Sequence, residues 1–420
     1  MTASTTPHEL LHNEFTAPAP VDEHWQRTYR YLHAHPELTG EEFETARLVA
    51  RELRAMHGWE VTEGVGGTGV VGVLQGGPGP VIWLRADMDA LPVQEQTGLE
   101  YASRTAGVMH ACGHDMHVTA LLAACAQLAA ETVAGTVVAI FQPAEEGGDG
   151  ARHMLDDGLL ERFPRPRIVL GQHVNPLPAG LIVSKGGPVM AASDTIRVTM
   201  KGVGGHGSSP HLSVDPLTMA ASLLLRLQSL TARQAARPGS PVLNVGALHG
   251  GTRSNVIPDA AEMLMTLRTF SGSSRALMLE GIERLAAAEA AAAGAPEAPL
   301  IEVAHGYPVT VNTPADTARV LAGFAAHGMP TITMGHPQTG SEDFGRFATA
   351  AGCPSVFWFI GAYPLDRYTE EGLALMTNDH QLPPGLPVNH SPLFAPDPEQ
   401  TLPTAVQAMV IAARAELAAE

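Results

Sequence analysis

Short apolar runs alternate with helical patterns along most of this chain, and that alternation restricts the fold more than any other feature. Four runs rich in β-branched residues predict buried strands at 70–74, 81–84, 136–141 and 168–172. Helical patterns accompany them at 22–31, 40–57, 115–130 and 151–157, the second with Glu41, Glu42 and Glu44 in its first turn, where the helix dipole favours acids. This alternation favours an α/β fold with a largely parallel sheet covered by helices.

The pattern changes after residue 191. Its elements are a strand at 195–200, a helix from Asp215-Pro216 to about 230, strands at 242–248 and 260–270, a helix at 275–293 and a strand at 300–304. The order β-α-β-β-α-β is typical of a ferredoxin-like domain. Alternation resumes from 305, with a helix at 341–350, a strand at 355–360 and a helix at 402–419. We therefore expect one domain built from 1–191 and 305–420, with 192–304 inserted and a loose tail up to about residue 20.

Composition excludes several classes of protein. A chain of 420 residues has room for two or three domains. The net charge of −18 argues against nucleic acid or an anionic membrane as a partner, because both require a basic face. Three cysteines do not make a disulfide framework, so a reducing compartment fits best. The first 20 residues lack a secretory pattern, and the apolar stretch 118–130 is too short to span a bilayer. We expect a cytoplasmic protein.

The segment 110–117, His-Ala-Cys-Gly-His-Asp-Met-His, is the richest in chemistry. Cys112 and His114 lie in a turn that opens the helix at 115–130. A thiolate and an imidazole at this spacing can face one cation, and a helix N-terminus lowers the pKa of a thiol. The alternative is a buried cysteine with polar capping residues in a loop.

Three further segments place polar side chains after apolar strands or far downstream. Glu145 and Glu146 follow the strand at 136–141, His173 ends the strand at 168–172, and His390 stands in Asn-His-Ser-Pro. One of two adjacent carboxylates can bind a metal while its neighbour acts as a general base. Taken singly, the glutamates can be a solvated loop and each histidine an ordinary loop residue. Because the carboxyl ends of such strands converge, we expect these side chains to gather at one place.

The inserted block carries three polar residues of interest. His206 lies in the glycine-rich loop 204–211, Asn255 precedes a strand, and Arg268 lies on that strand. An arginine can bind a carboxylate through two parallel hydrogen bonds. Arg268 can equally be a plain surface residue of the strand.

Taken together, six ordered motifs resemble the amidohydrolase branch of the peptidase M20 family, which includes aminoacylases, hippurate hydrolases and auxin–amino acid conjugate hydrolases. The resemblance runs from about residue 33 to 392. Its motifs are residues 84–92, 110–115, 141–146, 205–211, 255–258 and 341–344. It implies an α/β metallopeptidase domain of the phosphorylase/hydrolase-like type, with a largely parallel mixed sheet, and an inserted ferredoxin-like domain that acts as a lid and forms a homodimer.

The resemblance also implies a site with two divalent metal ions. Its ligands are Cys112, His114, Glu146, His173 and His390, with Cys112 bridging the two ions. The thiolate favours zinc, while manganese, cobalt and nickel are alternatives. Glu145 is implied as the general base and Asp89 as the carboxylate that orients a ligand histidine. Asp87 stands where other branches have a metal-binding histidine, so we do not expect it to be a ligand.

In the inserted domain, the resemblance assigns His206 to the oxyanion, from its own or a partner subunit, and Asn255 and Arg268 to the substrate carboxylate. The implied reaction is hydrolysis of the amide bond of small N-acyl amino acids. A dipeptidase or carboxypeptidase on the same site is the alternative. A non-catalytic binding protein would have lost a ligand or the base, and none is missing. Arg253 departs from the family pattern, and His117, His211 and residues 341–344 are expected to support the site without assigned chemistry.

Overall fold

The computed structural model describes residues 20–232, 240–376 and 382–419. These fall into two compact units. Unit 1 comprises Met1–Gly187, Val311–Gly335 and Asp343–Glu420, within the described ranges; unit 2 comprises Pro188–Thr310 and His336–Glu342. The predicted insert 192–304 lies inside unit 2, and the predicted N-terminal tail falls, except for Pro20, outside the described residues.

Unit 1 is built on an eight-stranded sheet in the order β1-β2-β4-β3-β5-β16-β6-β15. Its strands are β1 (Trp59–Val65), β2 (Gly69–Gln75), β3 (Gly77–Asp87), β4 (Ala134–Gln142), β5 (Ile168–Pro178), β6 (Ile182–Ser184), β15 (Thr331–Thr333) and β16 (Ser355–Tyr363). The four central strands β4, β3, β5 and β16 are parallel to one another. Antiparallel pairs occur toward the edges, between β1 and β2, β2 and β4, and β6 and β16. The expected α/β fold with a mixed, largely parallel sheet is confirmed.

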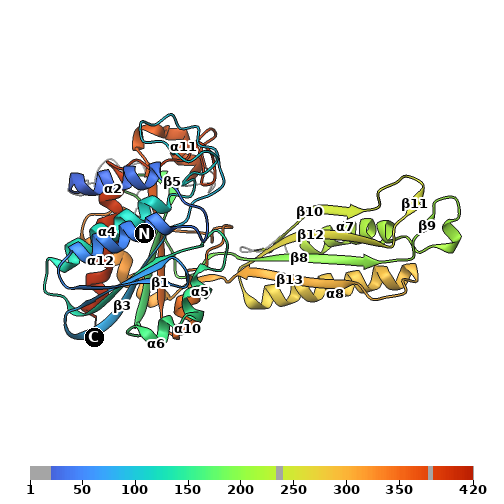
Figure 1. The fold of residues 1–420 in the computed structure, drawn as a ribbon, viewed down its shortest axis with the longest axis horizontal. Helices are drawn as coiled ribbons and strands as arrows, with labels where there is room; N and C mark the ends of the chain where they lie inside the picture. The colour runs from blue at the N-terminus through green and yellow to red at the C-terminus, as the bar shows by residue number, and fades with distance from the viewer. Residues whose placement is uncertain (1–19, 233–239, 377–381, 420) are drawn as a thin grey trace, which may run out of the picture. The chain divides into compact units, whose positions relative to one another are not determined.

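Helices cover both faces of this sheet (Figure 1). One face carries α2 (Glu23–Ala34), α3 (Phe43–Ala55), α4 (His114–Ala129), α9 (Pro314–Ala326) and α12 (Thr401–Leu417). The other carries α5 (Gly150–Asp156) and α10 (Gly345–Ala351), and the short helices α6 (Leu159–Arg162) and α11 (Glu370–Ala374) complete the unit. Successive strand residues alternate between the two faces, so Ile82 and Leu84 join the core beneath α4 while Trp83 packs edge-on against Phe347 of α10. Burial on both faces explains why the central strands are continuously apolar.

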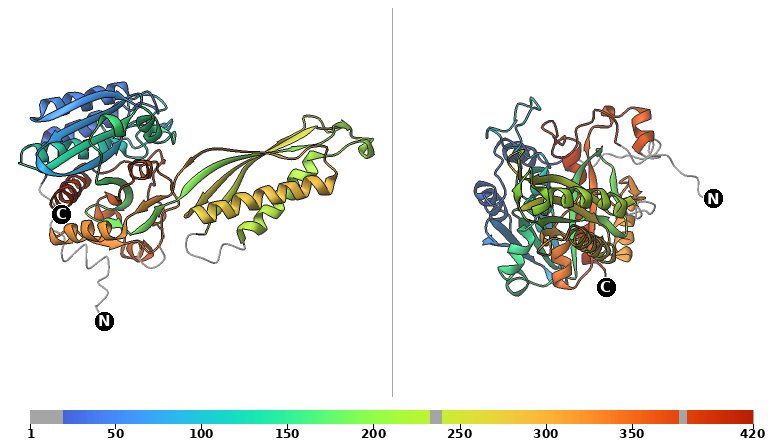
Figure 2. Two further views of the ribbon diagram at one scale, coloured as in Figure 1. Left: turned by 90° about the horizontal axis from the view of Figure 1, so that it is seen from below. Right: turned by 90° about the vertical axis from the view of Figure 1, so that its right-hand side faces the viewer.

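Unit 2 has the predicted β-α-β-β-α-β order. Its elements are β8 (Ala192–Lys201), α7 (Pro216–Ala232), β10 (Val242–Gly250), β12 (Ala260–Thr269), α8 (Gly272–Ala293) and β13 (Leu300–Tyr307). The strands form an antiparallel sheet in the order β10-β12-β8-β13, and α7 and α8 lie side by side on one face of it (Figure 2). A short ladder joins β9 (Gly205–His206) to β11 (Val256–Ile257). The other short elements are divided between the two units. They are β7 (Gly187–Met190), β14 (Thr310–Asn312), η1 (Pro210–Leu212) and η2 (Leu365–Arg367).

The predicted helix at 341–350 is wrong over its first four residues. Helix α10 begins only at Gly345, and residues 341–344 are irregular. The cause is the buried Asp343 carboxylate, which accepts hydrogen bonds from Ala151 N at 2.9 Å and Gln142 Nε2 at 2.7 Å. These long-range bonds hold the segment in place without helical backbone pairing, and periodicity alone cannot show them.

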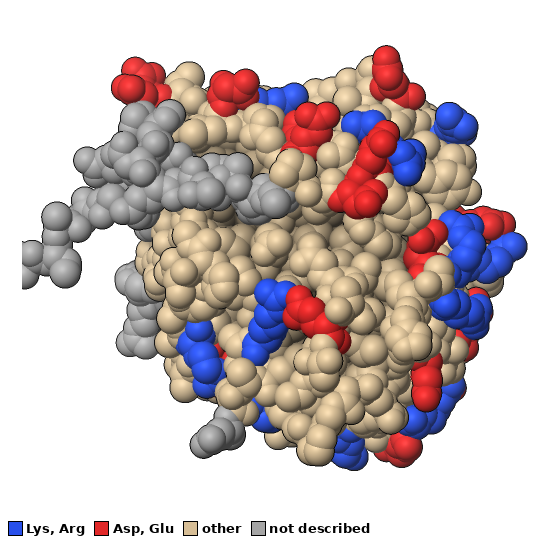
Figure 3. Space-filling model, turned by 90° about the vertical axis from the view of Figure 1, so that its left-hand side faces the viewer, with Lys and Arg blue, Asp and Glu red and all other residues tan. Residues whose placement is uncertain are grey.

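The surface of unit 1 mixes charges of both signs. On the face drawn in Figure 3, Lys and Arg side chains are interspersed with Asp and Glu among the described residues. Among these residues, no helix combines the length and the apolar character that a membrane crossing needs.

Candidate metal centre

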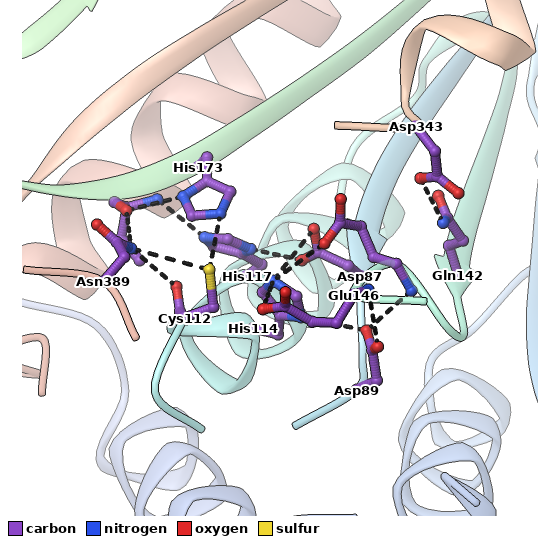
Figure 4. A network of polar contacts seen from close by, with 12 residues as sticks. Asp87, Asp89, Cys112, His114, His117, Gln142, Glu146, His173, Asp343 and Asn389 are labelled. Atoms are coloured by element: carbon purple, nitrogen blue, oxygen red, sulfur yellow. Dashed lines mark hydrogen bonds and ion pairs between the residues drawn. The ribbon is translucent and has the colours of Figure 1, made fainter. Parts of the chain in front are cut away.

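Most of the polar side chains singled out in the sequence outside the inserted block meet at one edge of the unit 1 sheet (Figure 4). Strands β3, β4 and β5 are parallel and end on the same side. Residues 87–89 lie at the end of β3, and Glu145 and Glu146 follow β4. His173 lies within β5, two residues past the point at which β5 stops pairing with β3. Helix α4 starts at this edge and supplies His114, with Cys112 just before it. This is the place where open α/β sheets build their sites.

Gly113 makes the turn between Cys112 and His114 possible. It is the N-cap of α4 and has a left-handed backbone with φ of 85°. A Cβ atom at this position would lie 2.4 Å from Val174 Cγ2, so both the conformation and the space require glycine. The turn lets the thiol and the imidazole face the same point.

Two clusters of three donors share the Cys112 thiol. Within each cluster the donor atoms all lie within 4.8 Å of one another. One cluster is Cys112, His114 and His173, and the other is Cys112, Glu146 and His390. The Cys112 Sγ atom lies 3.4 Å from His173 Nε2, and His390 Nε2 lies 3.3 Å from Glu146 Oε1. All five residues expected as ligands are therefore brought together, with the thiol at the centre.

The contacts of two of these histidines suit a metal site. His173 Nδ1 donates to the Val174 carbonyl at 2.8 Å, which leaves the Nε2 lone pair directed toward Cys112. His114 Nδ1 lies 3.3 Å from Asp89 Oδ1, and its Nε2 has no hydrogen-bond partner among the described residues although it is buried. A carboxylate or carbonyl behind each imidazole is the usual support for a metal ligand. Sulfur, nitrogen and carboxylate oxygen together fit divalent transition metals.

Buried charges make the centre attractive to cations. Burial, together with Glu146 and Glu145, raises the pKa of the Cys112 thiol well above its usual value. Burial also opposes protonation of His114, but Asp87 and Asp89 outweigh it and raise its pKa to about 10. Burial and the neighbouring His117 hold the pKa of His173 well below its usual value. Because metal binding requires the thiolate and neutral imidazoles, ions bound here would displace protons from Cys112 and His114.

Comparison with known proteins places this geometry in a family. The model of Peptidase family M20/M25/M40 matches residues 83–373. The chain belongs to this family.

This chain is similar to individual members of the family over most of its length. It is 38% identical over 340 residues to "Thermostable carboxypeptidase 1" of Saccharolobus solfataricus, covering 79% of this chain and 84% of that protein. It is 39% identical over 343 residues to the "Hippurate hydrolase" of Campylobacter jejuni, covering 79% and 87%. A solved structure from Bacillus subtilis, described as a dinuclear metal binding peptidase from the M20 family, superposes with a TM-score of 0.76 at 32% identity over 94% of this chain and 98% of that one. The protein is thus a hydrolase of the amidohydrolase branch that acts on amide bonds.

Asp87 lies beside the centre of this M20 enzyme, and each of its carboxylate oxygens contacts another side chain. Its Oδ2 accepts from Arg85 Nη1 at 2.6 Å, and its Oδ1 lies 2.5 Å from His117 Nδ1. Burial disfavours its charge, but Arg85 and the nearby histidines hold its pKa well below the usual value. Asp87, His114 and His117 are close enough to hold an ion, but both ring nitrogens of His117 already contact other protein atoms.

Asp89 contacts the main chain of both glutamates as well as His114. Its Oδ1 accepts from the backbone N–H of Glu145 at 3.1 Å, and its Oδ2 accepts from Glu146 N at 3.0 Å and from Thr39 Oγ1 at 2.7 Å. The same carboxylate therefore fixes the main chain of both glutamates. Glu145 is almost buried, and its Oε2 lies 4.0 Å from His114 Nε2.

A buried ionic network behind the centre was not predicted. Arg85 is 1% exposed; besides Asp87, it donates to Gln142 Oε1 at 2.8 Å and to Asp343 Oδ1 at 3.3 Å. The signal that could have revealed it is the arginine itself, since a charged residue within an apolar buried strand requires partners.

The predicted residues of the inserted block lie in unit 2. His206 pairs with Val256 across the β9–β11 ladder, and its Nδ1 accepts from Ser208 N at 3.1 Å, so the ring proton is on Nε2. Asn255 lies beside the same ladder, where its carbonyl accepts from Gly207 N at 2.8 Å. Arg268 donates to Thr339 O at 2.7 Å and to Ser341 Oγ at 3.0 Å. Ser341 is therefore a partner of Arg268. The sequence had given Ser341 no assigned chemistry.

Proposed function

We propose that this enzyme hydrolyses the amide bond of N-acyl amino acids, with Glu145 as general base. The observation that carries the proposal is the pair of donor clusters sharing Cys112, with the Glu145 carboxylate 4.0 Å from His114 Nε2. A centre of this composition with the Glu145 carboxylate beside it suits attack by an activated water on an amide. The similarity to a protein named hippurate hydrolase supports an N-acyl amino acid as the substrate.

The proposed ligands are Cys112, His114, Glu146, His173 and His390. Two divalent ions held by them would polarise the scissile carbonyl and lower the pKa of a bound water to about 7. Glu145 accepts a proton from the attacking water and delivers it to the leaving amine. Asp89 holds the Glu145 main chain and the His114 ring in position during these proton transfers.

Residues of unit 2 are proposed to recognise the substrate. His206 carries its proton on Nε2, which suits donation to an oxyanion. Asn255 and Arg268 are proposed to hold the carboxylate of the amino acid, and Arg268 would exchange its bonds to Thr339 and Ser341 for that carboxylate. Unit 2 is proposed to act as a lid and as the interface of a homodimer, which leaves open which subunit supplies His206.

Zinc is the metal that we propose, because the shared ligand is a thiolate; manganese, cobalt and nickel remain alternatives. A cytoplasmic location fits three cysteines that are all free, since free thiols persist in reducing compartments. The net charge of −18 argues against nucleic acid or a membrane surface as the partner and favours a small molecule.

A carboxypeptidase or dipeptidase is the alternative function, favoured by the 38% identity to a protein named carboxypeptidase. The same centre and the same carboxylate anchor serve both reactions. Only the group on the acyl side of the scissile bond differs, so a substrate panel separates the two.

The test is hydrolysis of N-acetyl amino acids, hippurate and dipeptides by the zinc-loaded enzyme and by Glu145→Gln. We expect turnover of the N-acyl compounds, and a fall in kcat of about 10² to 10⁴-fold in Glu145→Gln because the proton acceptor is lost. Metal analysis of both proteins is the control, since Glu145 is not a proposed ligand and the variant should retain two ions. If only dipeptides were hydrolysed, the dipeptidase assignment would replace that of an aminoacylase. An unchanged kcat in Glu145→Gln would remove that residue from the mechanism.

A further inference from the structure

His117 lies in the wall of the metal centre but has no place in the proposed ligand set. It is buried on α4, with its ring centroid 5.4 Å from that of His114 and 4.6 Å from that of His173 (Figure 4). Its Nδ1 lies 2.5 Å from Asp87 Oδ1, and Val174 N–H donates to its Nε2 at 2.9 Å. Both ring nitrogens are thus engaged with protein atoms.

These two contacts determine where the ring proton is. The backbone N–H of Val174 can only donate, so Nε2 is an acceptor and the proton of the neutral ring is on Nδ1. Nδ1 then donates to Asp87, whose other oxygen accepts from Arg85. In this tautomer, His117 has no lone pair left for a cation.

The Val174 N–H needs this acceptor because of the sheet topology. The ladder between β3 and β5 runs from Ile82 opposite Ile168 to Arg85 opposite Gly171 and goes no further. Past Gly171, β3 is no longer beside β5, and Val174 is completely buried. A buried N–H without an acceptor is costly. The imidazole of His117, coming from α4, takes the place of the missing strand.

Val174 also controls the neighbouring proposed ligand. Its carbonyl accepts from His173 Nδ1 at 2.8 Å and from Asn389 Nδ2 at 3.1 Å. The N–H and the carbonyl of this one residue therefore connect α4, through His117, to the ring of His173, whose Nε2 faces Cys112.

We propose that His117 is a positioning residue that fixes β5 against α4 at Val174, beyond the β3–β5 ladder, and so sets the direction of His173 toward the Cys112 thiol. The inference rests on the proposed function only in taking His173 and Cys112 as metal ligands. It requires no turnover, so it can be tested separately from the reaction.

Two substitutions separate the contacts of the ring. In His117→Gln, the amide oxygen can reach the position of Nε2 and accept from Val174. In His117→Asn, the shorter amide can donate to Asp87 from the position of Nδ1 but cannot reach Val174. The full-length protein and both variants are loaded with Co²⁺, and the thiolate-to-cobalt charge-transfer and d–d absorption bands are recorded. Cobalt affinity is measured by competition with a chelator.

We expect His117→Asn to bind cobalt about 10 to 100-fold more weakly, with shifted absorption bands, because supports of metal ligands have effects of this size. His117→Gln should stay close to wild type. Hydrogen exchange of the Val174 amide in the metal-free proteins is the second measurement, with protection in wild type and His117→Gln and faster exchange in His117→Asn.

Equal cobalt affinity and spectra in all three proteins would overturn the proposal, as would equal weakening in both variants, because the Val174 contact would then not matter. If His117→Asn does not fold, fast exchange of the Val174 amide in wild type would overturn it and slow exchange would support it. Absence of amide hydrolysis by wild type, with the expected cobalt results, would reject the proposed function and leave this inference standing.

Discussion

Two residues beside the metal centre have a left-handed backbone conformation, which residues other than glycine rarely adopt. Ala144 has φ of 53° and His390 has φ of 70°, and among the described residues other than glycine only these two have positive φ. One precedes Glu145 and the other is a proposed ligand. Strained conformations persist where surrounding contacts enforce them. For Ala144 the enforcing contact is Glu42, whose Oε1 accepts from Ala144 N at 2.9 Å.

Glu42 is the first test of this argument. It is buried and also accepts from Gly40 N at 2.8 Å and from Thr68 Oγ1 at 2.5 Å. Glu42→Ala leaves several donors without an acceptor, so we expect the free energy of unfolding to fall by about 2–4 kcal/mol and kcat to fall more than KM changes. Glu42→Gln keeps an acceptor oxygen and should be much milder. Urea denaturation and steady-state kinetics measure both, and equal losses in the two variants would contradict the assigned role.

The sequence could not single out this residue. Glu41, Glu42 and Glu44 were predicted together as acids of a helix first turn, and helix α3 in fact begins at Phe43 with Glu42 as a cap residue that makes no capping bond. Which of three neighbouring acids turns inward depends on Ala144, about a hundred positions away. By contrast, Glu145, Glu146 and His173 could be predicted, because the ends of parallel strands meet wherever the sheet forms.

At the scale of elements, His33 ties helix α2 to helix α4 and to the irregular segment between Leu91 and Met109. Its Nδ1 lies 2.7 Å from Asp115 Oδ2, and its Nε2 lies 3.2 Å from Glu95 Oε1. Glu95 in turn accepts from Ser103 N at 2.6 Å and so organises its own segment. Burial opposes a charge on His33, but the bonds to Asp115 and Glu95 outweigh it and raise its pKa to about 9.

This shift predicts how stability depends on pH. Between the ordinary histidine pKa of 6.5 and about 9, the unfolded chain has released the His33 proton while the folded chain retains it. The free energy of unfolding should therefore fall as pH rises through this window, and the His33 contribution should be fully present below pH 6.5. Urea denaturation at several pH values, compared with His33→Gln, isolates it from other groups. Parallel pH curves for the two proteins would rule out the charged His33.

Several long elements were predicted from their local pattern. The central strands and helices α4, α7, α8 and α12 follow from periodicity. The strands β6 and β15 have only three residues each and were missed, because so short a run carries no period. Strand β1 and helix α9 were also missed, although they have 7 and 13 residues. Residues 341–344 were misassigned because Asp343 bonds to Ala151 and Gln142, which lie far away in sequence.

At the scale of the whole molecule, each unit has a core of its own. The core of unit 2 is formed by residues of β8, β12, α7 and α8, and includes Ile196, Leu223, Met263 and Ile282. All five proposed ligands and Glu145 lie in unit 1. A β-α-β-β-α-β block with its own apolar pattern could be recognised from the sequence, whereas the residues at which the chain returns to it, 336–342, could not. They carry no periodic signal and are held by Arg268 on β12.

Because the donors belong to one unit, metal removal should affect the two units differently. Ions that bind only the folded chain stabilise it by RT ln(1 + [L]/Kd), about 2.7 kcal/mol at a hundred times Kd for one ion. Removing them with a chelator should therefore increase hydrogen exchange in β3, β4 and β5 of unit 1. Strands β8 and β12 of unit 2 should keep their protection, since their core contains no donor. Exchange measured by mass spectrometry before chelation, after it and after zinc is restored provides the comparison. If the unit 2 strands lost protection together with unit 1, the two cores would unfold as one cooperative structure, and the metal centre would stabilise the entire chain.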